Sequence, residues 1–132
     1  MKSHETYVKV RYAETDQMGV VYHGNYPQYL EIARIDWLES LGISYKNMEQ
    51  EGIMLPVFEL NLKYHQPITF NENIKIETRL RERPNVKIIF DYVIYNEDGK
   101  KVTSASSVLV FMDARTRKPI RCPNYIYDKL EA

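Results

Sequence analysis

Cysteine is nearly absent from this sequence of 132 residues, which holds only Cys122. No disulfide can form within one chain, and this favours a reducing compartment. The first residues also lack the apolar segment of a signal peptide. The longest apolar stretch, Val108 to Met112, is far too short to span a bilayer. We therefore expect a cytoplasmic protein with no stable membrane association.

A surplus of positive charge is absent too. Lys plus Arg and Asp plus Glu number 18 each, which gives a formal net charge of zero. Proteins that bind nucleic acid through its phosphates usually carry a basic excess, so no nucleic-acid partner is expected. A local basic pocket for one phosphorylated ligand remains compatible with this balance.

The motifs of several common hydrolase classes are missing as well. The three histidines, His4, His23 and His65, do not have the spacing of metal ligands, so no metal site is predicted. No Gly-x-Ser-x-Gly motif surrounds a serine, and Cys122 has no evident base nearby. Serine and cysteine nucleophiles are therefore poor candidates for catalysis.

The composition that is present, 44% hydrophobic and 27% charged, is ordinary for a globular protein, and the length fits a single domain over residues 1–132. Apolar residues that alternate predict strands, and those repeated every three or four positions predict helices. The expected elements are a strand at 6–12, a structured loop at 13–24, a long helix at 25–41, a short helix at 44–51, and strands at 57–66, 73–83, 86–96 and 101–113.

The long predicted helix has recognisable ends. Asn25 is suited to cap its start, Pro27 is tolerated in a first turn, and Gly42 is a natural stop. The strands that follow are joined by short turns, which predicts an antiparallel sheet against which the helix buries its apolar face. The fold class is therefore α+β. A homodimer is the simplest way to cover an edge or face of the sheet that remains open.

The segment from Tyr12 to Tyr26 carries the most informative chemistry, because it places Asp16 on a loop that leads into the long helix. The start of a helix presents unpaired backbone N–H groups and a partial positive charge, which can polarise a carbonyl and stabilise an oxyanion. A carboxylate beside such a site can attack a thioester or deprotonate a water. From these residue types alone, a turn-capping role for Asp16 is the stronger interpretation.

The run from Glu14 to Tyr26, Glu-Thr-Asp-Gln-Met-Gly-Val-Val-Tyr-His-Gly-Asn-Tyr, resembles the signature of the 4-hydroxybenzoyl-CoA thioesterase family. It is most similar to the bacterial short-chain acyl-CoA thioesterases associated with the Tol-Pal system, and a weaker similarity continues through most of the chain. The resemblance implies a hotdog fold, in which an antiparallel sheet of five or six strands curves around one long central helix. It also implies active sites at the interface of a homodimer, which assembles further into a homotetramer.

The same resemblance implies roles for individual residues. Asp16 matches the catalytic aspartate of the family, and His23 matches the position whose backbone N–H polarises the thioester carbonyl. The side chain of His23 is as compatible with a structural role as with a direct one. Tyr22, Asn25 and Tyr26 are expected to shape the pocket. No cofactor is implied, because coenzyme A is part of the substrate.

The basic residues depart from the family pattern. Some members hold the phosphates of CoA with a basic cluster before a strand, but here the turn Pro84-Asn85 shifts the register of that region. We predict that Arg83 and Lys87 contact the phosphates, since Arg supplies a fork of donors and Lys a point charge. Glu14 is interpreted as a solvated or supporting residue and not as a second catalytic acid.

The expected function is hydrolysis of an acyl-CoA, with a short- to medium-chain or aromatic acyl group, to the free acid and CoA. Asp16 acts as nucleophile or as general base, and the sequence does not separate these routes. Two other functions remain open: a hotdog enoyl-thioester hydratase or dehydratase, and a non-catalytic acyl-CoA binding protein. The first would hydrate an enoyl thioester, and the second would bind CoA without turnover.

Overall fold

The chain folds around one antiparallel sheet whose five strands follow the order β1-β4-β5-β6-β3. The computed structural model describes residues 2–131. The strands of this sheet are β1 (Ser3–Lys9), β3 (Val57–Tyr64), β4 (Asn73–Leu80), β5 (Lys87–Tyr95) and β6 (Lys101–Val110), and a separate pair joins β2 (Ile53–Met54) to β7 (Met112–Asp113). The helices are η1 (Tyr12–Glu14), η2 (His23–Asn25), α1 (Tyr26–Ser40), α2 (Tyr45–Gln50) and α3 (Asn124–Glu131). The α+β class predicted from the sequence is confirmed.

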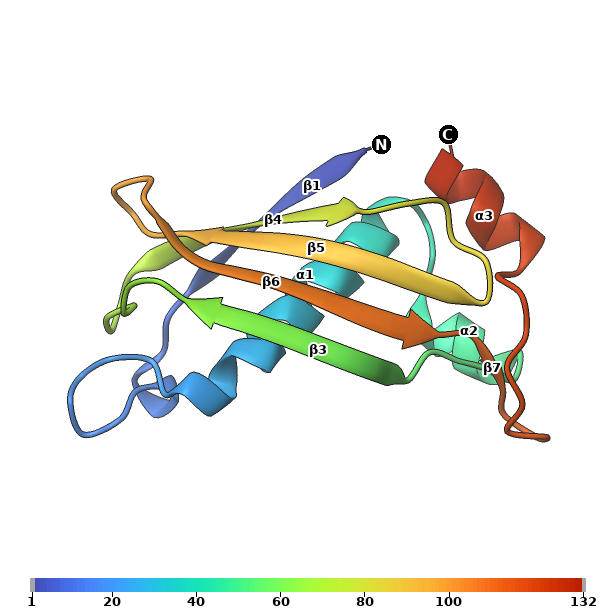
Figure 1. Ribbon diagram of the computed structural model, residues 1–132, viewed down its shortest axis with the longest axis horizontal. Coiled ribbons are helices and arrows are strands. Elements are labelled where there is room, and N and C mark those ends of the chain that lie inside the picture. The colour runs from blue at the N-terminus through green and yellow to red at the C-terminus, as the bar shows by residue number, and fades with distance from the viewer. Residues whose placement is uncertain (1, 132) are drawn as a thin grey trace.

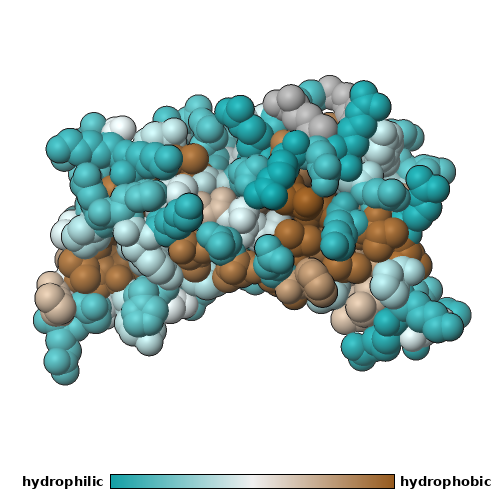
Figure 2. Space-filling view, viewed as in Figure 1, coloured by the Kyte–Doolittle hydropathy of each residue, from teal (hydrophilic) through white to brown (hydrophobic). Residues whose placement is uncertain are grey.

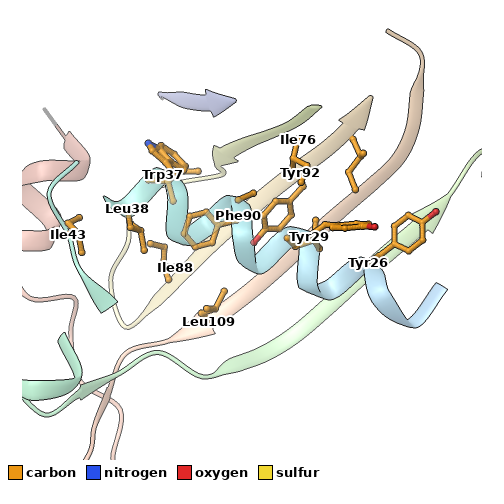
Figure 3. Close-up of a cluster of buried hydrophobic side chains, with 14 of the residues drawn as sticks. Tyr26, Tyr29, Trp37, Leu38, Ile43, Ile76, Ile88, Phe90, Tyr92 and Leu109 are labelled. Carbon is orange, nitrogen blue, oxygen red and sulfur yellow. The ribbon is translucent and has the colours of Figure 1, made fainter. Parts of the chain in front are cut away.

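The long helix α1 crosses one face of the sheet diagonally, from the end of β3 toward the end of β4 (Figure 1). On the buried side of α1, Trp37 meets Phe90 of β5 edge-on with 6.0 Å between ring centroids. Phe90 in turn stacks beside Tyr92 with 6.1 Å between centroids (Figure 3). Fully burying a large apolar side chain contributes about 1.5–3 kcal/mol. Burial of these three aromatic rings therefore contributes to the free energy that holds α1 on the sheet. None of the described helices is long and apolar enough to cross a bilayer.

The predicted ends of the long helix are correct to within one residue. Gly42 follows the helix with a φ of +79°, a conformation that suits glycine. Asn25 occupies the cap position, but its side chain does not cap the helix. The prediction was wrong on this point, because Nδ2 of Asn25 instead donates to the carbonyl of Glu14 at 2.9 Å.

Three predicted strands run past the residues that pair, and the one expected at 73–83 ends at Leu80, opposite Phe90. The first strand covers residues 3–9 and not 6–12, since β4 begins at Asn73, opposite Lys9, and offers no further partner. The last strand does not run to residue 113. It stops at Val110, opposite the first residue of β5, and the chain then leaves the main sheet to pair Met112 with Met54. The helix α3 was not predicted, although Ile126 and Leu130, four positions apart, are its buried residues.

The edge strand β3 is unusually exposed for a strand with so many apolar residues. Val57, Phe58, Leu60 and Tyr64 are 50%, 67%, 39% and 46% exposed. Figure 2 shows apolar side chains gathered along the lower edge of the view, over β3 and β6. A long apolar edge of this kind is a template for pairing with another chain.

Candidate active site

Asp16 lies at the start of a tight turn between η1 and η2. Its N–H donates to the carbonyl of Val20 at 2.8 Å, and the N–H of Gly19 donates back to the carbonyl of Asp16 at 3.1 Å. Gly19 has a φ of +79°, which explains a glycine at this position. Oδ1 of Asp16 accepts the N–H of Met18 at 2.8 Å. The carboxylate is thus held by its own turn, and no described residue donates to Oδ2.

The helix start next to this turn offers free donors. The one-turn helix η2 leads directly into α1, and its first internal hydrogen bond runs from Asn25 N–H to the carbonyl of Tyr22 at 2.9 Å. The N–H groups of His23 and Gly24 precede that bond, so the helix supplies no acceptor for them. They lie at the positive end of the helix dipole, where negative charge is stabilised.

Asp16 and His23 line one open cleft of about 330 Å³. Tyr26 lines it as well, so three of the predicted site residues are brought together. Its other lining residues are Val20, Val21, Tyr64, His65, Gln66 and Pro67. Asp16 is exposed to solvent in a single chain, and it forms part of the wall of this cleft. The cleft therefore places a carboxylate and a helix start within one site.

Two residues that were predicted to shape the pocket, Tyr22 and Asn25, lie next to the cleft and do not line it. Tyr22 is 47% exposed; its ring lies 4.4 Å from that of His23 and covers Gly24, where an added Cβ would approach the tyrosine ring to 2.6 Å. Asn25 does not line the cleft, and its amide holds the loop through the carbonyl of Glu14. These two residues shape the helix start and not the cleft wall.

Tyr64 is a cleft residue that the sequence reasoning missed. Its hydroxyl donates to the carbonyl of His23 at 2.9 Å, and its ring meets Tyr26 edge-on at 4.8 Å. Burial raises the pKa of Tyr64, so the hydroxyl stays protonated at neutral pH. The one available signal was its place as the last apolar residue of an alternating strand, just before His-Gln-Pro.

Glu14 is buried and not solvated, which corrects the first of the two roles considered for it. Oε1 accepts the backbone N–H of Arg11 at 2.9 Å and the hydroxyl of Tyr29 at 2.8 Å, while Oε2 accepts Nε of Arg11 at 2.8 Å. Burial alone would raise the pKa of Glu14, but these hydrogen bonds outweigh it and the pKa is lowered. Its carbonyl also accepts the N–H of Tyr22 at 2.9 Å. Glu14 therefore connects the Asp16 turn, the helix start and α1.

Arg83 and Lys87 are not brought to this cleft within one chain. Lys87 lies opposite Val110, whereas Tyr64 lies opposite Thr103. Those two positions of β6 are about 23 Å apart at the usual rise of a strand. Nζ of Lys87 sits 5.3 Å from the centre of the Phe58 ring, and Arg83 lies in the turn before β5. A phosphate role for either residue in this site needs a second chain.

The remaining reactive side chains offer no competing centre. Burial raises the pKa of the Cys122 thiol to about 11, so it is not a thiolate at neutral pH. His4 pairs with Asp36 at 2.8 Å, away from the cleft, and Nε2 of His65 lies 2.9 Å from Oγ of Ser104. Within residues 2–131, no three His, Cys, Asp or Glu side chains are grouped so that they could hold a metal ion.

Comparison with known proteins finds a thioesterase family model and relatives that are named as thioesterases. Residues 10–130 match the family model of the Thioesterase-like superfamily. YneP of Bacillus subtilis, described as a candidate acyl-CoA thioesterase, is 37% identical over 86% of this chain and 83% of its own length. The acyl-CoA thioester hydrolase YbgC of Escherichia coli is 27% identical over 90% of this chain and 89% of that protein. The crystal structure of a DHNA-CoA thioesterase from Staphylococcus aureus superposes with a TM-score of 0.92 at 39% identity, covering 99% of this chain and 92% of that one.

Proposed function

This chain belongs to the Thioesterase-like superfamily and has its hotdog fold, and from that premise we propose that it hydrolyses acyl-CoA thioesters in the cleft that holds Asp16. One observation carries the proposal. The Asp16 carboxylate and the free N–H groups of His23 and Gly24 belong to the same cleft and its helix start. Hydrolysis of a thioester needs both a base or nucleophile and a site for negative charge on the carbonyl oxygen.

In the proposed reaction, the thioester carbonyl points at the start of η2 and its oxygen accepts the N–H groups of His23 and Gly24. These donors stabilise the oxyanion that forms when the carbonyl carbon is attacked. The C–S bond then breaks, CoA leaves as the thiolate and takes up a proton, and water supplies the oxygen of the free acid. No cofactor takes part beyond the CoA of the substrate.

Asp16 performs one of two roles in this reaction. As a nucleophile it forms a mixed anhydride that water then cleaves, and as a general base it removes a proton from the attacking water. Single turnover in water labelled with oxygen-18 separates these routes. Label in the Asp16 carboxylate excludes simple base catalysis.

The proposed substrates are CoA thioesters with short- to medium-chain or aromatic acyl groups, as in the 4-hydroxybenzoyl-CoA thioesterase family and its Tol-Pal-associated members. The names of YneP, YbgC and the DHNA-CoA thioesterase support a CoA thioester as the substrate class. The proposed compartment is the cytoplasm, a reducing environment that suits a chain with a single cysteine.

A panel of acyl-CoA thioesters with thiol detection tests the proposal. We expect release of CoA from at least one short, medium or aromatic member, and no hydration of the matching enoyl-CoA. Hydration without CoA release would instead indicate the hydratase alternative. Protection against thermal unfolding by CoA, with no turnover of any member, would indicate a binding protein.

The proposed active unit is a homodimer in which two β3 strands pair antiparallel, and such dimers can associate further into a tetramer. The exposed apolar side chains of β3 and its free edge support this arrangement. Antiparallel pairing brings the Val57 end of one strand beside the Tyr64 end of the other. It therefore brings Lys87 of a second copy toward the Asp16 cleft, which is where its predicted phosphate contact requires it.

Leu60→Lys is expected to shift the protein from dimer to monomer at micromolar concentration and to lower CoA release. Position 60 lies at the middle of the β3 edge, so the two introduced lysines lie close together across the two-fold axis of the dimer. Their like charges repel, and each would lose contact with water on dimer formation. Light scattering after size-exclusion chromatography measures the mass. The matched control is Ile32→Lys on α1, since Ile32 is 43% exposed and Leu60 39%. An unchanged mass for Leu60→Lys, or a monomeric unmodified protein, contradicts pairing at β3.

A further inference from the structure

Arg34 is a buried positive charge with no carboxylate beside it. The residue is 5% exposed, and Nη1 donates to the hydroxyl of Tyr92 at 3.0 Å. Among residues 2–131 no carboxylate lies within ion-pair distance of Arg34, although Glu31 is one turn earlier on α1. Nε of Arg34 finds no hydrogen-bond acceptor in the same part of the chain. Burying a cation is unfavourable unless it is paired, so this arrangement needs an explanation.

A second polar side chain lies nearby. The hydroxyl of Tyr45 on α2 is buried beside the Arg34 guanidinium, and the two groups approach each other without the geometry of a well-formed hydrogen bond. Burial raises the pKa of Tyr45, and the charge of the Arg34 guanidinium and its hydrogen bonding to the hydroxyl offset only part of that rise. Tyr45 is therefore a neutral donor at neutral pH. The buried guanidinium of Arg34 on α1 thus has the neutral hydroxyls of Tyr45 and Tyr92 as its neighbours and no carboxylate.

A buried stripe of α1 connects this place to the Asp16 cleft. Tyr26, which lines the cleft, is followed by Leu30 and Arg34 at spacings of four, and all three are buried. Residues four apart lie on one side of a helix. Arg34 is about 12 Å beyond Tyr26 along the axis. Helical side chains lean toward the N-terminus, which brings the guanidinium closer to the cleft.

Strand β3, which lies beside this stripe of α1, has side chains on the same face that are only partly buried. Tyr64 contacts Tyr26, so the side chains of β3 that share its face, Leu62 and Leu60, also point toward α1. Leu60 is nevertheless 39% exposed and Leu62 is half-buried. Leu60 pairs with Ser107, whose Oγ lies 2.6 Å from the Tyr92 hydroxyl that accepts Nη1 of Arg34. An aliphatic strip of β3 that is partly exposed in one chain therefore leads from Tyr64 to the neighbourhood of Arg34.

We infer that Arg34 determines substrate specificity, and that the protein selects CoA thioesters whose acyl group ends in a second carboxylate. This inference rests on the proposed function. The thioester carbon stays between Asp16 and the helix start, the methylene chain lies along Leu30 and Leu60, and the distal carboxylate accepts hydrogen bonds from Arg34 and Tyr45. A neutral acyl end leaves the buried charge unpaired, whereas a carboxylate neutralises it and supplies acceptors for both donors.

Paired substrates of equal carbon number test the inference. The unmodified protein is expected to show at least about tenfold higher kcat/KM for adipoyl-CoA than for hexanoyl-CoA, the factor that one charge-assisted hydrogen bond provides. Arg34→Met is expected to reverse this preference, and Tyr45→Phe to reduce it. The matched control is Arg81→Met, because Arg81 pairs with Asp91 on the surface and its loss should leave the ratio unchanged. A ratio measured on one sample is independent of how much of it is folded.

A binding measurement on the unmodified protein covers the case in which Arg34→Met does not fold. Adipate is expected to raise the melting temperature, and its neutral diamide, adipamide, at equal concentration is expected to leave it unchanged. Equal shifts, or equal kcat/KM for the two thioesters, overturn the inference and leave thioester hydrolysis standing. No CoA release from any thioester, together with stabilisation by adipate alone, removes the proposed function and keeps the Arg34 carboxylate site.

Discussion

Asp16→Asn is expected to lower kcat for the best acyl-CoA substrate by roughly 10²–10⁴-fold, the range that a positioned base contributes. An amide neither removes a proton from water nor attacks a thioester at a useful rate. The fold should persist, because the Asn side-chain oxygen can still accept the N–H of Met18 that Oδ1 of Asp16 now accepts. We therefore expect a loss of thiol release with a melting temperature close to that of the unmodified protein.

Asp113→Asn is the matched control for this substitution. Oδ1 of Asp113 also holds a turn, by accepting the N–H groups of Arg115 at 2.8 Å and Thr116 at 3.1 Å, but Asp113 does not line the cleft. It should change kcat less than twofold, within the usual small effect of a surface substitution. Equal kcat for Asp16→Asn and the unmodified protein would remove Asp16 from the mechanism.

Glu14→Gln is expected to have the second-largest effect, on both stability and turnover. The amide replaces one carboxylate oxygen with a donor that faces Nε of Arg11, and the charge-assisted bonds to Arg11 and Tyr29 weaken. The free energy of unfolding should fall by about 1–3 kcal/mol, as for other hydrogen bonds to buried charged groups. Because Glu14 connects the Asp16 turn to α1, kcat should fall as well, by about tenfold or more.

Glu97→Gln controls for removal of a carboxylate that only caps a backbone group. Glu97 is exposed and accepts the N–H of Asn73 at 2.7 Å, and its replacement should change the unfolding free energy by less than about 0.5 kcal/mol. Chemical denaturation of both variants beside the unmodified protein gives the comparison. A Glu14→Gln variant with normal stability and normal kcat would contradict the connecting role assigned to Glu14.

The effect of Glu14 should also depend on pH. Its pKa in the folded protein is lowered from an ordinary value of 4.5, so its contribution to stability is present above that value and is lost as the pH falls through the folded pKa. The stability difference between the unmodified protein and Glu14→Gln should therefore be constant near neutral pH and shrink in acid below about 4.5. A difference that grows in acid would show that the charge of Glu14 is not what stabilises the loop.

Local sequence determined much of the fold and the most informative part of the site. The helix at 26–40, the turn that needs Gly19, and the loop that carries Asp16 into a helix start all depend on hydrogen bonds between residues a few positions apart. Such bonds follow from residue type and spacing. For this reason the long helix was predicted to within one residue, and the α+β class followed from the alternating strands.

Only the tertiary structure decided which distant residues meet. Tyr64 reaches His23 from 41 positions away, Glu14 is buried against Tyr29, and Arg34 lies beneath the sheet without a carboxylate. The same structure places Lys87 far from Asp16 within one chain. These outcomes depend on the order and register of the strands and on the angle at which α1 crosses them. That geometry arises from how side chains pack together across the whole core, which no short stretch of sequence records.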